Sequence, residues 1–187
     1  MWVLIGVGAA LLICIGYKHM HHYGVHDKEA MHHDEPQAGH YVSEHVGVMF
    51  DYPTKYIATS THAGDGHVIV LLPADYVPPI NGEGPATITV SQFSNANDLP
   101  LEQFIRNEPR ANFGLSDGQT TSTQVGGHPA LAYNYSGLYE SDGVAVAVHN
   151  KIFIFATGWY SPTDSLRQEL KDLLQTVVFI EEHDHAH

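Results

Sequence analysis

The chain has little cysteine and little positive charge. Its one cysteine, Cys14, lies inside an apolar run near the N-terminus, so the remainder of the chain can form no disulfide, thiol nucleophile or cysteine-based zinc site. The chain has eight lysines and arginines in total, compared with 21 acidic residues. This balance disfavours nucleic acid and anionic lipid as partners, because no cationic surface is available to displace counterions.

Recognisable catalytic motifs are also missing. The sequence contains no G-x-S-x-G elbow, phosphate-binding loop, H-E-x-x-H pair or dinucleotide fingerprint. Carboxylates are numerous, but no pair stands out as a general acid and base. We therefore assign no catalytic residue and expect a protein that is not an enzyme.

An apolar run, Trp2–Tyr17, opens the chain. As a helix it spans about 24 Å, somewhat short of the roughly 30 Å hydrocarbon core of a bilayer. A cleaved signal peptide is the alternative, but a basic n-region and an A-x-A site are absent. A lipoprotein signal ending at Cys14 is disfavoured because the preceding Ile13 is not small. We expect residues 1–17 to be a membrane anchor or uncleaved signal, with an extracytoplasmic domain behind it.

Histidine is abundant, with 15 residues in the chain. Residues 18–40 are polar and read as a His-rich linker, and residues 181–187 form an acidic, His-containing tail. If the linker is helical, one of its faces carries imidazoles and a carboxylate at steps of three or four residues. If the tail is extended, its three histidines occupy every second position, so all three imidazoles lie on one side. Both patterns suit Zn²⁺, Cu²⁺ or Ni²⁺. The predicted ligands are His19, His22, His26, Glu29, His33, His183, His185 and His187.

The alternative is that both tracts are solvated spacers, which bind metals weakly because they lack fixed geometry. A further group, His62, Asp65 and His67, surrounds the Asp65-Gly66 dipeptide. It could be taken for a metal site, but turn chemistry already accounts for Asp-Gly. We therefore favour a simple hairpin turn there.

The architecture is set by residues 127–180. Three apolar antiparallel strands are expected, and alternation of Val144, Val146 and Val148 with alanines makes both faces of the sheet apolar. A helix follows, with Ser161 as the expected N-cap and Pro162 as its first residue. Its stripe of Leu166, Leu170, Leu173 and Leu174 should cover one face of the sheet.

Upstream, the pattern predicts a first strand, a hairpin, another strand, a short helix begun by Pro100 and a Thr-rich strand. Their ranges are 47–53, 55–60 with 67–72, 86–93, 99–105 and 119–124, with a Pro-rich loop over 73–85. Aromatic residues on neighbouring strands are usually core or its rim, and a ligand platform is the less favoured interpretation. They are Tyr133, Tyr135, Tyr139, Trp159 and Tyr160.

The order of these segments resembles the PsbP-like (PsbP/Mog1) domain. The resemblance rests on GVMFDYP, ATITVSQF before LPLEQFI, then VGGHPALAYNY, GVAVAVHNKIFIFATGWY and LRQELKDLLQTVVFI. It covers residues 41–180, and in particular the chain looks like the bacterial members in which a membrane anchor precedes one such domain. The resemblance implies an α+β fold: a central antiparallel sheet flanked by helices on both faces, here behind one transmembrane helix. It also implies a non-catalytic accessory or binding module. The anchor, the linker and the absence of catalytic motifs lead us to expect that it binds or assists an envelope protein.

Overall fold

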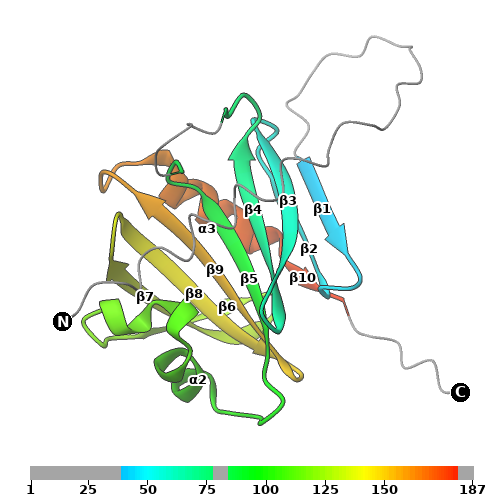
Figure 1. Cartoon of the computed structure of the whole chain (residues 1–187), viewed down its shortest axis with the longest axis vertical. Helices are drawn as coiled ribbons and strands as arrows, with labels where there is room; N and C mark the ends of the chain where they lie inside the picture. The colour runs from blue at the N-terminus through cyan, green and yellow to red at the C-terminus, as the bar shows by residue number, and fades with distance from the viewer. Residues whose placement is uncertain (1–38, 78–83, 181–187) are drawn as a thin grey trace, which may run out of the picture.

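The computed structural model describes residues 39–77 and 84–180 (Figure 1). They form the expected α+β fold with two α-helices, but the strands make two antiparallel sheets where the sequence predicted one central sheet. The predicted anchor, the linker as far as residue 38 and the tail lie outside the described residues. Within the two described ranges, neither helix has the length and apolar character needed to span a membrane.

The larger sheet has seven strands, all paired antiparallel. It combines the predicted hairpin with the predicted three-stranded meander. In spatial order the strands are β3 (Tyr56–Ala63), β4 (Gly66–Pro73), β5 (Ile88–Ser94), β9 (Lys151–Trp159), β8 (Glu140–Val148), β7 (His128–Ser136) and β6 (Thr121–Val125).

The smaller sheet has three strands and lies beside β3 and β4 (Figure 1). Its central strand is the predicted first strand, β2 (Val48–Tyr52), flanked by β1 (Gly39–Ser43) and the short β10 (Val178–Phe179). Strand β1 was not predicted, and it includes Gly39 and His40, which the sequence analysis placed in the linker. Its five residues are partly polar and none is fully buried, so they carry no apolar alternation.

Both faces of the large sheet are covered, as the alternation predicted. On β9, Phe153 and Phe155 belong to one buried cluster, which includes Phe50 from the small sheet and the leucines of the C-terminal helix. Ile152 and Ile154 belong to a second cluster beneath the shorter helix. The sheet is therefore the middle layer of the domain, with the two helices on opposite faces.

The C-terminal helix, α3 (Ser165–Thr176), begins later than expected. Its N-cap is Asp164, whose carboxylate accepts a hydrogen bond from the backbone N–H of Leu166 at 3.1 Å. The prediction of Ser161 as N-cap and Pro162 as first helical residue was wrong, because the nearer carboxylate caps the helix equally well. The leucine stripe was right: Leu166, Leu170 and Leu173 are buried, and Leu174 packs against the same cluster.

The shorter helix, α2 (Leu101–Asn107), confirms the predicted helix, with Pro100 at its N-cap. It buries Phe104 and Ile105 against the second face of the sheet. Two 3₁₀ turns that the sequence did not predict follow it, η2 (Pro109–Ala111) and η3 (Phe113–Leu115). They extend the cover over this face of the sheet.

Candidate metal centre

Two histidines meet at the tip of the β3–β4 hairpin. His62 and His67 are directly opposed residues of the two strands, and their ring centroids are 4.0 Å apart. The intervening turn contains Gly64 at a φ of 66°, a conformation that glycine adopts without strain. The strand pairing therefore brings the two imidazoles together as a consequence of the hairpin register.

A third histidine, His45, joins them from the small sheet. It lies in the turn between β1 and β2, which is closed by a hydrogen bond from the backbone N–H of Gly47 to the carbonyl of Ser43 at 2.8 Å. The next residue, Val46, is only 2% exposed and belongs to the main core, so the turn is fixed in place. The His45 ring centroid lies 4.7 Å from that of His67 and 6.2 Å from that of His62.

The three rings are close enough to share one ion. Each offers one nitrogen, and the three nitrogens lie within 4.8 Å of one another. A tetrahedral zinc site with typical Zn–N distances places its ligating nitrogens about 3.4 Å apart. His45 and His62 are exposed and His67 is partly buried, so an ion can reach the cluster from solvent. Binding would therefore require the nitrogens to move closer together than the 4.8 Å within which they lie.

Burial and neighbouring charges both favour the neutral form of the least exposed ring, His67. Burial lowers the pKa of His67, and the charges of His62, His45 and Lys151 lower it further. A neutral imidazole has the lone pair that a metal requires. Among the described residues, the three rings make no hydrogen bonds that would occupy those nitrogens. The Lys151 ammonium opposes cation binding, because its charge repels an incoming ion.

Asp65, which the sequence analysis considered together with His62 and His67, is not part of this cluster. Its carboxylate accepts a hydrogen bond at 3.0 Å from Arg110, which also donates to the carbonyl of Ala63 at 2.8 Å. The arginine lowers the pKa of Asp65 and stacks over the Phe93 ring at 4.6 Å. The expected hairpin turn is confirmed. The group that was considered as a metal site and set aside is divided: the two histidines converge, and the aspartate forms an ion pair.

The eight metal ligands predicted in the linker and tail lie outside the described residues, so the structure neither brings them together nor separates them. His45 was missed as a ligand. It lies 17 residues before His62, and no spacing rule connects them. The only signal in the sequence was the high overall number of histidines.

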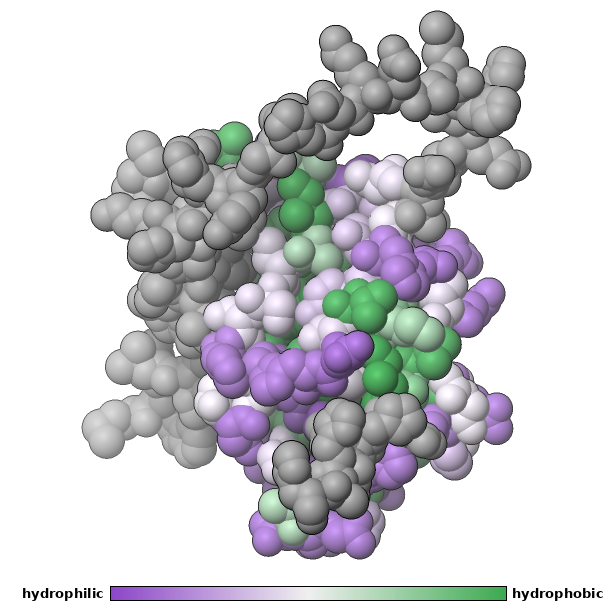
Figure 2. All heavy atoms as spheres, turned by 90° about the vertical axis from the view of Figure 1, so that its right-hand side faces the viewer, coloured by the Kyte–Doolittle hydropathy of each residue, from purple (hydrophilic) through white to green (hydrophobic). Residues whose placement is uncertain are grey.

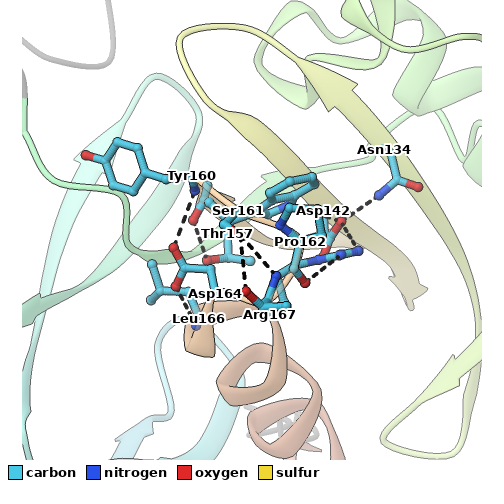
Figure 3. Close-up of polar contacts among 12 residues, drawn as sticks. Asn134, Asp142, Thr157, Tyr160, Ser161, Pro162, Asp164, Leu166 and Arg167 are labelled. Carbon is cyan, nitrogen blue, oxygen red and sulfur yellow. Dashed lines mark hydrogen bonds and ion pairs between the residues drawn. The ribbon is translucent and has the colours of Figure 1, made fainter.

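A second polar cluster surrounds Asp142 (Figure 3). Its carboxylate accepts hydrogen bonds from Arg167 at 2.7 and 3.1 Å, from Asn134 at 2.6 Å and from the indole of Trp159 at 3.3 Å. The guanidinium also lies 4.5 Å from the centre of the Trp159 ring. These contacts occupy the carboxylate and join α3 to β8. We interpret the cluster as a structural ion pair that holds α3 against β8.

The aromatic side chains considered as a ligand platform lie in different environments. Tyr133 and Tyr135 pack with the α2-side cluster, and the buried Tyr133 hydroxyl donates to the carbonyl of Ala111 at 2.8 Å. Burial raises the pKa of Tyr133. Tyr139 packs with the opposite cluster, and Tyr160 is 71% exposed. The set therefore does not share one surface, so the core interpretation is better supported.

Comparison with known proteins identifies the fold. No family model matches the chain, and no curated protein matches it. Among solved structures, a protein from Bacteroides thetaiotaomicron VPI-5482 superposes with a TM-score of 0.51 at 13% identity, covering 76% of this chain and 48% of its own. This chain thus spans about half the length of that protein.

Cyanobacterial PsbP (CyanoP) from Synechocystis sp. PCC 6803 superposes with a TM-score of 0.52 at 12% identity, over 81% of this chain and 98% of its own. LpqN of Mycobacterium tuberculosis, described as involved in cell envelope biogenesis, superposes with a TM-score of 0.44 at 16% identity. The match covers 78% of this chain and 91% of LpqN. The domain has a PsbP-like fold. At these identities the likeness concerns the fold alone.

Proposed function

We propose that the chain is a non-catalytic accessory module, tethered to a membrane by residues 1–17 and acting outside the cytoplasm on another envelope protein. The observation that carries this proposal is a PsbP-like domain beginning at Gly39, preceded in sequence by the apolar run and the polar linker. This arrangement is that of an anchor, a spacer and a binding domain.

The charged clusters of the domain support a non-catalytic role. Asp142 is held by Arg167, and Asp65 is held by Arg110. Glu169 accepts hydrogen bonds from Lys55 at 2.7 Å and from the Tyr56 hydroxyl at 2.6 Å. In each case the carboxylate is joined to a neighbouring element, which is the arrangement expected of structural ion pairs and not of a general acid or base.

Fractionation combined with protease accessibility tests the tether. The full chain should sediment with membranes, and protease added outside the cytoplasmic membrane should degrade the domain. A matched variant, Leu11→Asp with Leu12→Asp, should leave the membrane fraction, because each buried aspartate costs about 2.5–3.5 kcal/mol at the bilayer centre. A domain protected from protease, or a wild-type chain in the cytosol, would contradict the proposal.

Capture from solubilised membranes tests the partner. The full chain should recover a specific envelope protein after crosslinking. A control chain ending at residue 38 keeps the anchor and linker but lacks the domain, so it should recover none. Equal recovery by both chains would show that the domain is not what binds.

The second candidate function is capture of Zn²⁺, Cu²⁺ or Ni²⁺ by the linker and tail. It is favoured by composition: nine of the 15 histidines lie within residues 19–33 and 183–187. Calorimetric titration of the full chain should show several bound metal ions per chain, and most of them should be lost when these nine are replaced by asparagine. An affinity no tighter than about 10⁻⁴ M would remove this candidate.

A further inference from the structure

We propose that His45, His62 and His67 form a transition-metal site in the folded domain itself, separate from the linker and tail. The site supplies three imidazole nitrogens and leaves one coordination position open to solvent. It joins the small sheet to the large one, because His45 belongs to the β1–β2 turn and the other two histidines belong to the β3–β4 hairpin.

The donor set selects the class of ion. Imidazole suits Zn²⁺, Cu²⁺ and Ni²⁺, whereas Ca²⁺ and Mg²⁺ require oxygen ligands. No carboxylate belongs to the described cluster, and the nearest candidate in sequence, Asp65, is engaged by Arg110. Three neutral nitrogens with an open position are also compatible with a fourth ligand from water or another molecule.

The backbone around the three ligands is well fixed. His62 and His67 are held opposite each other by the strand ladder, and His45 precedes the buried Val46. Gly66, next to His67, packs so tightly on β5 that a Cβ there would lie 1.9 Å from the carbonyl oxygen of Gln92. Closing the nitrogens from 4.8 Å to ligating distance therefore requires side-chain rotation without movement of the strands.

A metal bound at this cluster should stabilise the folded state. His45 comes from a different segment than His62 and His67 and meets them only when the two sheets pack together, so the unfolded chain has no equivalent three-ligand site. Ligands within the linker or within the tail are close in sequence and are available in folded and unfolded chains alike. A metal-dependent rise in melting temperature therefore distinguishes the two kinds of site.

Two charge effects act in opposite directions. The Lys151 ammonium lies near enough to His67 to lower its pKa and repels a divalent cation. The net charge of −13 attracts cations toward the molecule as a whole. Lys151→Gln should therefore tighten metal binding, because it removes the repelling charge.

Thermal unfolding in a background free of the other histidine tracts tests the site. In the full chain, the nine histidines of residues 19–33 and 183–187 are replaced by asparagine. Chlorides of Zn²⁺, Cu²⁺ and Ni²⁺ are added separately, with EDTA as reference. At a free metal concentration a hundredfold above the dissociation constant, the melting temperature should rise by roughly 5–10 °C.

Single variants assign the ligands. His45→Asn, His62→Asn and His67→Asn should each remove most of the rise while leaving the melting temperature in EDTA nearly unchanged for the two exposed positions. His149→Asn is the control: it lies in a turn with a φ of 53°, which asparagine tolerates, and should keep the full rise. Imidazole NMR resonances of the three histidines, but not of His149, should shift with Zn²⁺.

Two results would overturn the proposal. One is a background protein that none of the three metals stabilises. The other is a His45→Asn protein that is stabilised as much as its parent, since binding would then not join the two sheets. Neither result bears on the membrane-tethered accessory role, which is tested separately.

Discussion

His67 has surroundings that should make the stability of the domain depend on pH. It is partly buried, and three cationic or titratable groups face it: His62 from β3, His45 from the β1–β2 turn and Lys151 from the start of β9. All of them disfavour the protonated ring. The folded state therefore holds this proton less tightly than the unfolded chain does.

The consequence is a loss of stability in acid. Above the unfolded pKa of about 6.5, His67 is neutral in both states and does not change the free energy of unfolding. As the pH falls below that value, the unfolded chain takes up the proton first and the free energy of unfolding decreases. Urea titrations at pH 7.5 and 5 in EDTA should show this decrease, and His67→Asn should reduce it. An unchanged decrease in His67→Asn, equal to that of a His149→Asn control, would contradict the assignment.

Gly66 is a position where the backbone of a neighbouring strand leaves no space for a larger residue. Gly66→Ala should lower the free energy of unfolding by about 2–4 kcal/mol, because the added methyl would overlap the backbone of β5. Gly114→Ala is the matched control: a Cβ there meets nothing within 4 Å, and the change should stay within about 0.5 kcal/mol. Chemical denaturation of both variants measures the difference. Equal effects would mean that β4 and β5 are less closely packed than described.

At the scale of single residues, the sequence predicts two of the three histidines of the candidate metal centre. His62 and His67 flank a recognisable turn, so their approach follows from hairpin pairing. His45 reaches them only through the packing of one sheet on another, which local spacing does not encode. Asp65 is adjacent in sequence but is removed by Arg110, 45 residues away, and this competition depends on the position of η2.

Among the elements, α3 illustrates how a boundary depends on one hydrogen bond. Asp164→Ala should destabilise the domain by about 1 kcal/mol, because the first turn loses its cap. Ser161→Ala, the cap expected from sequence, should change stability by less than about 0.5 kcal/mol. Denaturant midpoints compare the two. A larger loss in Ser161→Ala would restore the original N-cap assignment.

Elements with long apolar alternation were predictable, and short polar ones were not. The meander β7–β9 and the leucine stripe of α3 each carry a repeated pattern over nine or more residues. Strand β1 has five residues and pairs only with β2, so its conformation depends on tertiary contact. The 3₁₀ turns η2 and η3 contain three residues each, too few for a periodic signal.

At the scale of the molecule, the two sheets share one core. Phe50 from β2 and Phe155 from β9 are both fully buried in the same cluster. On the outside, the face that carries the small sheet shows apolar residues gathered among hydrophilic ones (Figure 2). The small sheet therefore contributes to the interior of the domain and to its surface.

A shared core predicts a single cooperative transition. Phe50→Ala and Phe155→Ala should each cost about 3–5 kcal/mol and shift the same unfolding curve, including the fluorescence of Trp159 in the large sheet. A Trp2→Phe background isolates that signal. Leu138→Ala, at a 63% exposed position, is the control and should have little effect. If Phe50→Ala left the Trp159 transition in place, the small sheet would be an independent unit.

The edge position of β1 has a mechanical consequence. Tension arriving along the chain from its N-terminal side acts first at Gly39, which is paired with Tyr52 at the open end of the β1–β2 hairpin. If this end is pulled away from the sheet, the residue pairs of the β1–β2 ladder separate one after another from Gly39 toward Ser43, and each pair resists the force separately. Strand β2 comes under direct tension only after the hairpin has opened as far as the turn that holds His45.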